Sequence, residues 1–472
     1  MPHRRHRILL IPYPVQGHIN PTFQFAKRLI ALGAHVTLST TIYMHNRITN
    51  KPTLPNLSYL PFSDGYDDVG YKGNGNDVTY SLYAAEFNRR GSEFVTNLIL
   101  WNSQQGTPFT CLVHSILLTW AAKVARELHL PTALLWIQPA TVFDIIYHYF
   151  HGHSELIKNP ECSIALPGLS LLLSQRDLPS FLLESDLSAY SNYNSLMLTF
   201  FEEQIKDLDV EKNPTTILVN SFEALEPEAL RSVEKLNMIS IGPLVPSAFL
   251  DVKEPTKYNS FGGQSQTHIF QPSNDCVEWL DSKKEMSVIY ISFGSLIVLS
   301  KVQMEEIARA LLDCGFSFLW VIKEKEELLS YREELEKKGK IVKWCSQVEV
   351  LSHSSLGCFL THCGWNSSLE SLVSGVPMVA FPRRMDQMTN AKLIEDVWKI
   401  GVRVDYKVDE YGIVRGDEIK KCLEVVMGSG EKGEELRRNA IEWKNLAREA
   451  VKEYGSSHKN LRGFLDDTIA RS

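Results

Sequence analysis

The segment 344–387 contains side chains whose types and spacing suit the binding of an anion. His362, Asn366 and Ser367 follow a short apolar run, 357–360, that has strand character, and a helical spacing of apolar residues begins directly after them. The first turn of a helix has backbone N–H groups without intrahelical partners, and the helix dipole favours negative charge there. Side-chain donors beside such a turn predict a phosphate-binding site.

His18 is the second candidate for chemistry, as a base. It lies in the sequence PVQGHINP, between an apolar run at 7–11 that we expect to be a strand and a helix that should begin at Asn20, with Pro21 in the first helical position. Ligands of α/β proteins bind at the carboxyl ends of strands, so this histidine should face a cleft, where an imidazole can accept a proton. The alternative is a structural histidine that a helix start satisfies.

Two copies of an alternating strand and helix pattern must position these groups. The first copy has expected strands at 7–11, 35–38, 111–113 and 132–136, and the second has them at 287–295, 318–322, 357–360 and 376–381. Apolar strands separated by helices predict parallel sheets with crossover helices, and therefore an α/β fold with two doubly wound halves. Gly375 should end the phosphate-site helix in a left-handed conformation, and a linker with a mobile loop is expected at 242–273.

Length and composition agree with a large cytoplasmic protein. The 472 residues exceed one ordinary core, and the formal net charge of −7 argues against a nucleic-acid surface. No apolar run reaches the roughly 18 residues that a membrane span requires, and the basic start leads into only a short apolar run, so we expect neither a signal peptide nor a membrane anchor. Eight scattered cysteines fit reduced thiols. We expect a monomer without nucleic-acid or membrane partners.

The segment 344–387, WCSQVEVLSHSSLGCFLTHCGWNSSLESLVSGVPMVAFPRRMDQ, closely resembles the donor-binding signature of plant UDP-sugar-dependent glycosyltransferases, and the string QGHINP around His18 resembles the acceptor-base motif of that family. The resemblance implies the GT-B fold, in which two Rossmann-like doubly wound domains face each other across an interdomain cleft. It implies three parts: an N-terminal acceptor-binding domain at 1–245, a C-terminal UDP-sugar-binding domain at 246–450, and a helix at 451–472 that crosses back to the N-terminal domain.

The resemblance also assigns roles on the donor side. In that family the tryptophan that opens the box stacks on uracil and a glutamate bonds the ribose hydroxyls, which points to Trp344 and Glu370. Asp386 and Gln387 would hold the sugar, and a closing glutamine goes with UDP-glucose; a solvated turn is the alternative. UDP-glucose is expected as a co-substrate, without a metal or other cofactor. The predicted donor-binding residues are Ser295, Trp344, Cys345, Gln347, His362, Gly364, Trp365, Asn366, Ser367, Glu370, Asp386 and Gln387.

On the catalytic side, the resemblance implies a single inverting displacement in which His18 takes the acceptor proton while UDP leaves toward the helix N-terminus. The family usually has an aspartate after the third core strand to orient this histidine, and here Ser115 occupies that position. A hydroxyl can fix the tautomer of an imidazole but cannot stabilise imidazolium by charge, so acidic phenols or carboxylates are favoured as acceptors. Asp144 or a water is the alternative helper.

Three segments, 62–68, 135–140 and 176–181, resemble a subgroup that contains anthocyanin 5-O-glucosyltransferases and relatives that glucosylate carboxylic acids. The predicted function is therefore inverting transfer of glucose from UDP-glucose to a hydroxyl or carboxyl of a small plant metabolite, such as a flavonoid or anthocyanin, giving a β-glucoside. The alternatives are glucose ester formation on a hormone or terpenoid acid, UDP-glucuronate as donor, or a weakly active nucleotide-sugar-binding protein. Arg383 and Arg384 either attract a carboxylate of donor or acceptor or form a solvated turn.

Two groups look like metal sites without meeting the requirements. Asp207 and Asp209 have the DxD form of metal-dependent sugar transferases, but they lie in a polar, helical surface run without the preceding strand that such a site needs. A second group is dense in histidine but unequally spaced across a helix end, which favours ordinary cleft or surface residues. Its members are His148, His151, His153 and Glu155.

Overall fold

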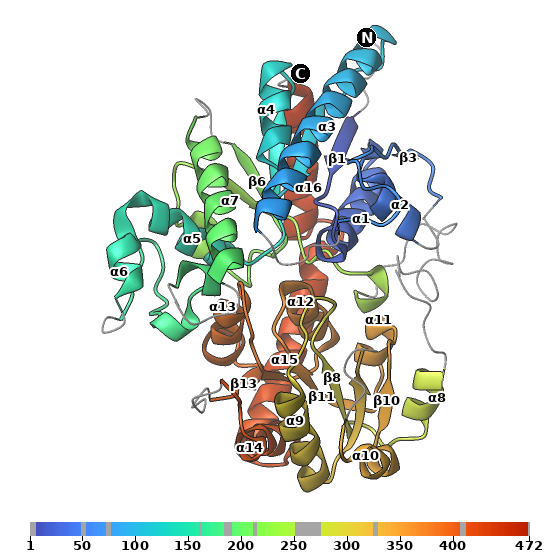
Figure 1. Ribbon diagram of the computed structural model, residues 1–472, viewed down its shortest axis with the longest axis vertical. Coiled ribbons are helices and arrows are strands. Elements are labelled where there is room, and N and C mark those ends of the chain that lie inside the picture. The colour runs from blue at the N-terminus through green and yellow to red at the C-terminus, as the bar shows by residue number, and fades with distance from the viewer. Residues whose placement is uncertain are drawn as a thin grey trace.

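Two lobes stacked along the long axis of the molecule make up the structure, a computed structural model (Figure 1). Each lobe is built around its own parallel sheet. Most of the linker expected at 242–273, together with Cys162 and the first five residues, lies outside the described residues. The structure describes residues 6–48, 53–71, 77–159, 163–183, 191–210, 215–250, 275–323, 329–405 and 412–470.

The sheet of the N-terminal lobe has seven parallel strands in the order β3-β2-β1-β4-β5-β6-β7. Its central strands are continuously buried rather than alternating, as expected where helices cover both faces of a sheet. The strand order reverses between β1 and β4, which creates a crevice at their carboxyl ends. The strands are β1 Arg7–Ile11, β2 His35–Leu38, β3 Leu57–Tyr59, β4 Cys111–Ser115, β5 Thr132–Trp136, β6 Thr216–Val219 and β7 Asn237–Ser240.

The helices of this lobe connect successive strands and cover the sheet (Figure 1). Short π-helical and 3-10 turns lie at 149–153, 175–177, 180–182, 229–231 and 247–249. The helices are α1 Gln16–Ala31, α2 Ile42–Arg47, α3 Asp77–Gln104, α4 Thr119–Glu127, α5 Ala140–His148, α6 Ser154–Lys158 and α7 Ser191–Val210.

The C-terminal lobe repeats the plan with six parallel strands in the order β10-β9-β8-β11-β12-β13, and its order reverses between β8 and β11. The strands are β8 Val288–Ser292, β9 Ser317–Val321, β10 Lys340–Val342, β11 Leu356–Thr361, β12 Met378–Ala380 and β13 Gly401–Arg403. The helices are α8 Asp275–Asp281, α9 Lys301–Cys314, α10 Arg332–Lys338, α11 Gln347–Leu351, α12 Trp365–Ser374, α13 Gln387–Lys392 (followed by a π-helical turn at 393–397), α14 Gly416–Met427, α15 Glu431–Val451 and α16 Ser456–Ala470.

The last helix, α16, leaves the C-terminal lobe and lies in the N-terminal one, as its red ribbon in the upper half of Figure 1 shows. Leu461, Phe464 and Leu465 are buried in the N-terminal core. Asn460 Nδ2 donates to the carbonyl of Ser240, at 2.9 Å, at the end of β7. The boundaries at 245/246 and 450/451 stay predictions, whereas the expected architecture of two facing doubly wound lobes is confirmed. No helix of the described residues combines the length and apolar character needed to cross a membrane.

One element differs from the sequence-based expectation: α1 does not begin at Asn20. It begins at Gln16, so Pro21 lies inside the helix. Proline has no N–H to offer the carbonyl four residues earlier, which belongs to Gly17. That carbonyl instead accepts a hydrogen bond of 2.9 Å from Asn366 Nδ2. The other lobe therefore supplies a partner that the helix cannot provide, and the prediction of the helix start was wrong for that reason.

Candidate active site

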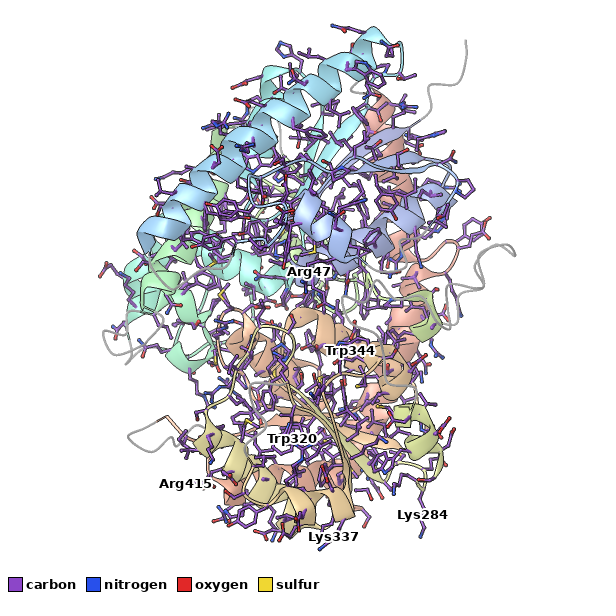
Figure 2. The ribbon with its side chains drawn as sticks, turned by 45° about the vertical axis from the view of Figure 1, so that its right-hand side comes forward. Arg47, Lys284, Trp320, Lys337, Trp344 and Arg415 are labelled. Carbon is purple, nitrogen blue, oxygen red and sulfur yellow. The ribbon has the colours of Figure 1, made fainter. Side chains whose placement is uncertain are left out.

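A cavity of about 1120 Å³ lies between the lobes, at the carboxyl ends of the central strands of both sheets. Figure 2 shows Trp344 at the end of the lower lobe that faces the upper lobe, whereas Trp320 lies deeper within the lower lobe. The structure brings His18 and the whole predicted donor-binding set to this cavity. Its lining includes His18, Ser295, Trp344, Cys345, Gln347, His362, Gly364, Trp365, Asn366, Ser367, Glu370, Asp386 and Gln387.

Ser115 does not line the cavity but holds the imidazole of His18. His18 Nδ1 lies 3.0 Å from Ser115 Oγ, the N–H of Tyr13 donates to the same oxygen at 2.8 Å, and the hydroxyl donates to the carbonyl of Ile116 at 3.4 Å. A serine hydroxyl has one hydrogen to donate and two lone pairs that accept. The hydrogen and both lone pairs of the Ser115 hydroxyl are used if Nδ1 of His18 carries the proton. This network assigns the tautomer whose Nε2 lone pair is free to accept a proton from a substrate.

The surroundings keep His18 neutral. Burial by the cleft walls lowers the pKa of His18 to about 3, because the charged imidazolium would lose hydration without gaining a counter-ion. Asp144, the alternative helper, is fully buried on α5, and the described cavity lining does not include it. Burial raises the pKa of Asp144 well above its usual range. His18 therefore has the protonation state that a base requires, with a low proton affinity, and its catalytic role stays a prediction.

On the opposite wall, a strand, a turn and a helix meet at the predicted phosphate-binding site (the phosphate cradle), whose role stays a prediction. β11 ends at Thr361, Cys363 adopts a left-handed φ of 62°, and α12 begins at Trp365. The ring of His362 fits between Gly294 and Gly364, because a Cβ atom at these positions would lie 2.7 and 2.5 Å from its ring atoms. Burial, with Lys323 and Arg384 nearby, lowers the pKa of His362 to about 4, so a neutral imidazole stands beside the helix N-terminus.

Gln347 lies at the centre of a hydrogen-bond network in the cavity wall. Its Nε2 donates to Glu370 Oε2 at 2.6 Å and to Ser367 Oγ at 3.1 Å, and its Oε1 accepts from the hydroxyl of Tyr290 at 3.2 Å. The Cys345 sulfur lies 3.5 Å from that same hydroxyl. Burial raises the pKa of Glu370 to about 7, although the Gln347 hydrogen bond favours its ionised form. The predicted hydrogen bond from Glu370 to ribose hydroxyls stays a prediction.

The turn at the sugar end is buried rather than solvated, since Asp386 and Gln387 are only 7% and 6% exposed. Gln387 Oε1 accepts the backbone N–H groups of Arg383 and Arg384 at 2.9 and 3.1 Å, which leaves its amide N–H groups as donors. Asp386 accepts from Asn390 Nδ2 at 2.8 Å, and burial raises its pKa to about 6. The pair thus offers both hydrogen-bond donors and an acceptor to the cavity, and its role in holding the sugar stays a prediction.

Two of the predicted UDP-sugar-binding residues also form hydrogen bonds between the lobes. The indole N–H of Trp365 donates to the carbonyl of Asn220 at 2.9 Å, and its side chain is buried. Asn366 donates across the cleft to Gly17, the residue before His18. The helix that carries the cradle is therefore bonded directly to the helix that carries the base.

Comparison with known proteins agrees with this geometry. The family of "UDP-glucoronosyl and UDP-glucosyl transferase" proteins matches residues 249–427. Phloretin 4'-O-glucosyltransferase of Malus domestica is 56% identical over 487 residues, which cover 98% of each chain. Anthocyanidin 3-O-glucoside 5-O-glucosyltransferase of Verbena hybrida is 50% identical over 98% of this chain and 99% of its own. The chain belongs to this family of UDP-glycosyltransferases.

The three-dimensional comparison places the glycosyltransferase in the GT-B fold class. The crystal structure of Os79 from O. sativa in complex with UDP matches with a TM-score of 0.83 and 33% identity, over 98% of this chain and 100% of that one. The whole arrangement of two lobes, and not only the donor-binding segment, is thus shared with a solved relative.

The two groups that look like metal sites have other partners in this glycosyltransferase. Asp207 forms an ion pair of 2.6 Å with Arg126, and Asp209 Oδ2 lies 3.1 Å from His151 Nε2; neither aspartate is among the described residues that line the cavity. In the described part of the chain, no group of three or more His, Cys, Asp or Glu side chains is positioned to hold a metal ion.

Sequence reasoning missed two features of the acceptor side. Gln138 is 8% exposed and lines the cavity, and its Oε1 has no hydrogen-bond partner among the described residues. It follows the carboxyl end of β5, a position that the strand-end rule used for His18 would have indicated. The second feature is a wall of tyrosine rings, in which Tyr71 and Tyr83 stack at 4.4 Å and the hydroxyls of Tyr13 and Tyr80 lie 3.0 Å apart.

Proposed function

We propose that this glycosyltransferase transfers glucose from UDP-glucose to a phenolic hydroxyl of a flat plant metabolite of the flavonoid type, with inversion to a β-glucoside. The observation that carries the proposal is the position of His18: its assigned free Nε2 belongs to a cavity with a tyrosine wall on one side and the phosphate cradle on the other.

In the proposed reaction, His18 Nε2 accepts the proton of the acceptor hydroxyl as that oxygen attacks the anomeric carbon. The bond from that carbon to the UDP oxygen breaks on the opposite side, which inverts the configuration. The developing negative charge falls on the diphosphate, where His362, Ser367 and the first N–H groups of α12 stabilise it. We propose that these groups serve in place of a metal ion.

Three properties of the N-terminal wall favour a phenol over a carboxylic acid. Its rings give a flat, apolar surface on which an aromatic acceptor can stack. No Lys or Arg occurs among the described residues that line the cavity from this lobe, so a carboxylate would lack a cationic partner there. The low pKa of His18 suits a hydroxyl that loses its proton readily. The relatives named for phloretin and anthocyanidin glucosides support the same class.

Gln138 gives this proposal a specific polar contact. Because its buried Oε1 accepts no hydrogen bond from the described residues, a hydroxyl of the acceptor that reaches it would satisfy a group that is otherwise costly to bury. A polyphenol offers such a second hydroxyl at a fixed distance from the one that reacts. We further propose that the protein acts as a monomer in the cytosol, where its described cysteines, all unpaired, would stay reduced.

The test measures transfer to a panel of acceptors, once with UDP-glucose and once with UDP-glucuronate as the donor, and includes a control without acceptor. Mass spectrometry identifies the products, and NMR gives their anomeric configuration. We expect β-O-glucosides of flavonoids, with little turnover of aromatic and terpenoid carboxylic acids. Glucose esters as the main product would overturn the acceptor class, and preference for UDP-glucuronate would overturn the donor. UDP-glucose binding without any transfer would establish a binding protein instead.

A further inference from the structure

The turn that carries the proposed sugar-binding pair is fastened to the other lobe by Ser180. The N–H of Met385 donates to Ser180 Oγ at 2.7 Å, and the N–H of Ser180 donates to the carbonyl of Met385 at 2.9 Å. Met385 has a φ of 61°, in the left-handed region that non-glycine residues rarely adopt. Two hydrogen bonds in opposite directions therefore hold a strained residue directly before Asp386.

The conformation of Met385 sets the direction of the pair that follows. Asp386 occupies the N-cap position of α13, and Gln387 is the first residue of that helix. On the near side, the turn is closed internally, because Gln387 Oε1 accepts the N–H groups of Arg383 and Arg384. The described hydrogen bonds of the Met385 backbone go to Ser180, in the other lobe. Release of Met385 to an ordinary φ would rotate the chain into α13 and redirect both sugar-binding side chains.

The lobes are also joined nearby through bonds that do not involve the turn. The carboxylate of Asp177 pairs with Arg403 on β13 at 2.7 Å, with side chains that are 1% and 6% exposed. Thr389 Oγ1 donates to the carbonyl of Asp177 at 2.7 Å. These bonds keep the lobes together without Ser180, so the contribution of Ser180 to the turn can be separated from its contribution to the interface.

We propose that Ser180, a residue of the acceptor-binding lobe, is a positioning residue for donor-sugar recognition. It acts through Met385, whose left-handed conformation aims Asp386 and Gln387 at the sugar. The inference rests on the proposed function, because it takes these two residues as the sugar site. It adds that sugar selectivity depends on the acceptor lobe, from a residue that need not touch the sugar.

The experiment measures kcat and KM with UDP-glucose and UDP-galactose, together with the Kd for UDP, for the full-length enzyme and its variants. Ser180→Ala should lower the glucose-to-galactose ratio of kcat/KM by about tenfold, the effect of one well-made hydrogen bond, while the Kd for UDP changes less than about twofold. Ser180→Thr, which keeps the hydroxyl, should restore the ratio. Thr389→Ala removes an interlobe bond but leaves the turn intact, so its ratio should equal that of the wild type.

Two results would overturn the inference: an unchanged ratio in Ser180→Ala, or equal losses in Ser180→Ala and Thr389→Ala, which would reduce Ser180 to an interface contact. Gln387→Asn separates this failure from that of the proposed function. If Gln387→Asn lowers the ratio and Ser180→Ala does not, only the role of Ser180 is wrong. If neither variant changes the ratio, or the wild type does not discriminate, the assigned sugar site is wrong as well.

Discussion

The two walls of the cleft differ in how the chain builds them. More than half of the lining residues from the C-terminal lobe come from one continuous segment, 344–387, and the others lie at 290–298, 321–323 and 343. The wall of the N-terminal lobe is assembled from short pieces that are far apart in the sequence. These pieces lie at 13–20, 41–43, 64–71, 80–83, 116–117, 137–138 and 197–201.

The walls also differ in how their polar groups are satisfied. On the donor wall, the side chains bond one another before any ligand arrives, as Gln347 does with Glu370 and Asn390 does with Asp386. On the acceptor wall, aromatic rings dominate and Gln138 keeps a buried oxygen unbonded within the described residues. Preorganised polar groups suit one constant ligand, whereas an apolar surface with few polar contacts tolerates variation. The difference between the walls indicates that a donor whose structure is constant and an acceptor whose structure varies require different kinds of binding surface.

Apart from removal of the proposed base, the largest expected effect tests the preorganised wall. In Gly364→Ala, the new Cβ would lie 2.5 Å from His362 Nε2, so the imidazole must move out of its position. We expect UDP-glucose to bind about 10- to 100-fold more weakly, equivalent to the loss of a charge-assisted hydrogen bond of about 1.5–3 kcal/mol. Calorimetry measures this, with His362→Ala as the matched variant. Wild-type affinity in both variants would show that the cradle lies elsewhere.

The bond between the walls should have the next largest effect. Asn366→Ala removes the hydrogen bond to Gly17 and should lower turnover about tenfold by loosening the alignment of base and cradle. Pro21→Ala gives α1 an N–H that competes for the same carbonyl, so Asn366→Ala should cost less in that background, by about 1 kcal/mol of coupling. Kinetics of the two single variants and the double variant measure this. Additive effects would disprove the coupling.

Ser115→Asp sharpens the account of the acceptor wall. A carboxylate bonded to His18 Nδ1 would stabilise the imidazolium that forms during transfer, which matters most for weakly acidic hydroxyls. We expect the ratio of activity on weakly acidic acceptors to activity on acidic phenols to rise by roughly a few-fold, which corresponds to the energy of one weak charge interaction. An acceptor series of graded acidity provides the measurement. A uniform fall across the series would mean that the missing charge does not limit the reaction.

The smallest effect concerns pH. The pKa of Glu370 is raised to about 7, so its carboxyl is protonated below that pH and becomes a full acceptor for ribose hydroxyls above it. The affinity for UDP-glucose should therefore rise as pH increases from 6 to 8, by less than about tenfold. His362, with a pKa lowered to about 4, stays neutral throughout this range. Binding that is independent of pH, or a Glu370→Gln variant that keeps the dependence, would refute this role.

The donor wall could be predicted from sequence because its signals are local. The apolar run at 357–360 became part of β11, Leu369, Leu372 and Val373 form the buried face of α12, and Gly375 ends that helix with a φ of 74°. Strand, turn and helix are contiguous, so short-range periodicity contains the geometry. The doubly wound fold followed from the same kind of pattern.

The remaining features depend on contacts that periodicity cannot reveal. The start of α1 was misplaced because the group that compensates for Pro21 belongs to Asn366, in the other lobe. Two hydrogen bonds join Ser180 and Met385, which are 205 positions apart in the sequence. The tyrosine wall combines side chains from different elements, none of which has a distinctive pattern alone. Contacts between residues that are far apart in the sequence can be identified only from the three-dimensional structure.

The central claim is that the walls divide the work: the N-terminal lobe supplies the base and the C-terminal lobe holds the nucleotide. His18→Ala tests it most directly, with turnover and UDP-glucose affinity measured on the same preparation. We predict that turnover falls at least about a thousandfold, while the Kd for UDP-glucose stays within about twofold, because among the described residues the imidazole is hydrogen-bonded to Ser115 and not to the donor wall. Turnover within tenfold of the wild type, or a parallel loss of UDP-glucose binding, would contradict the account.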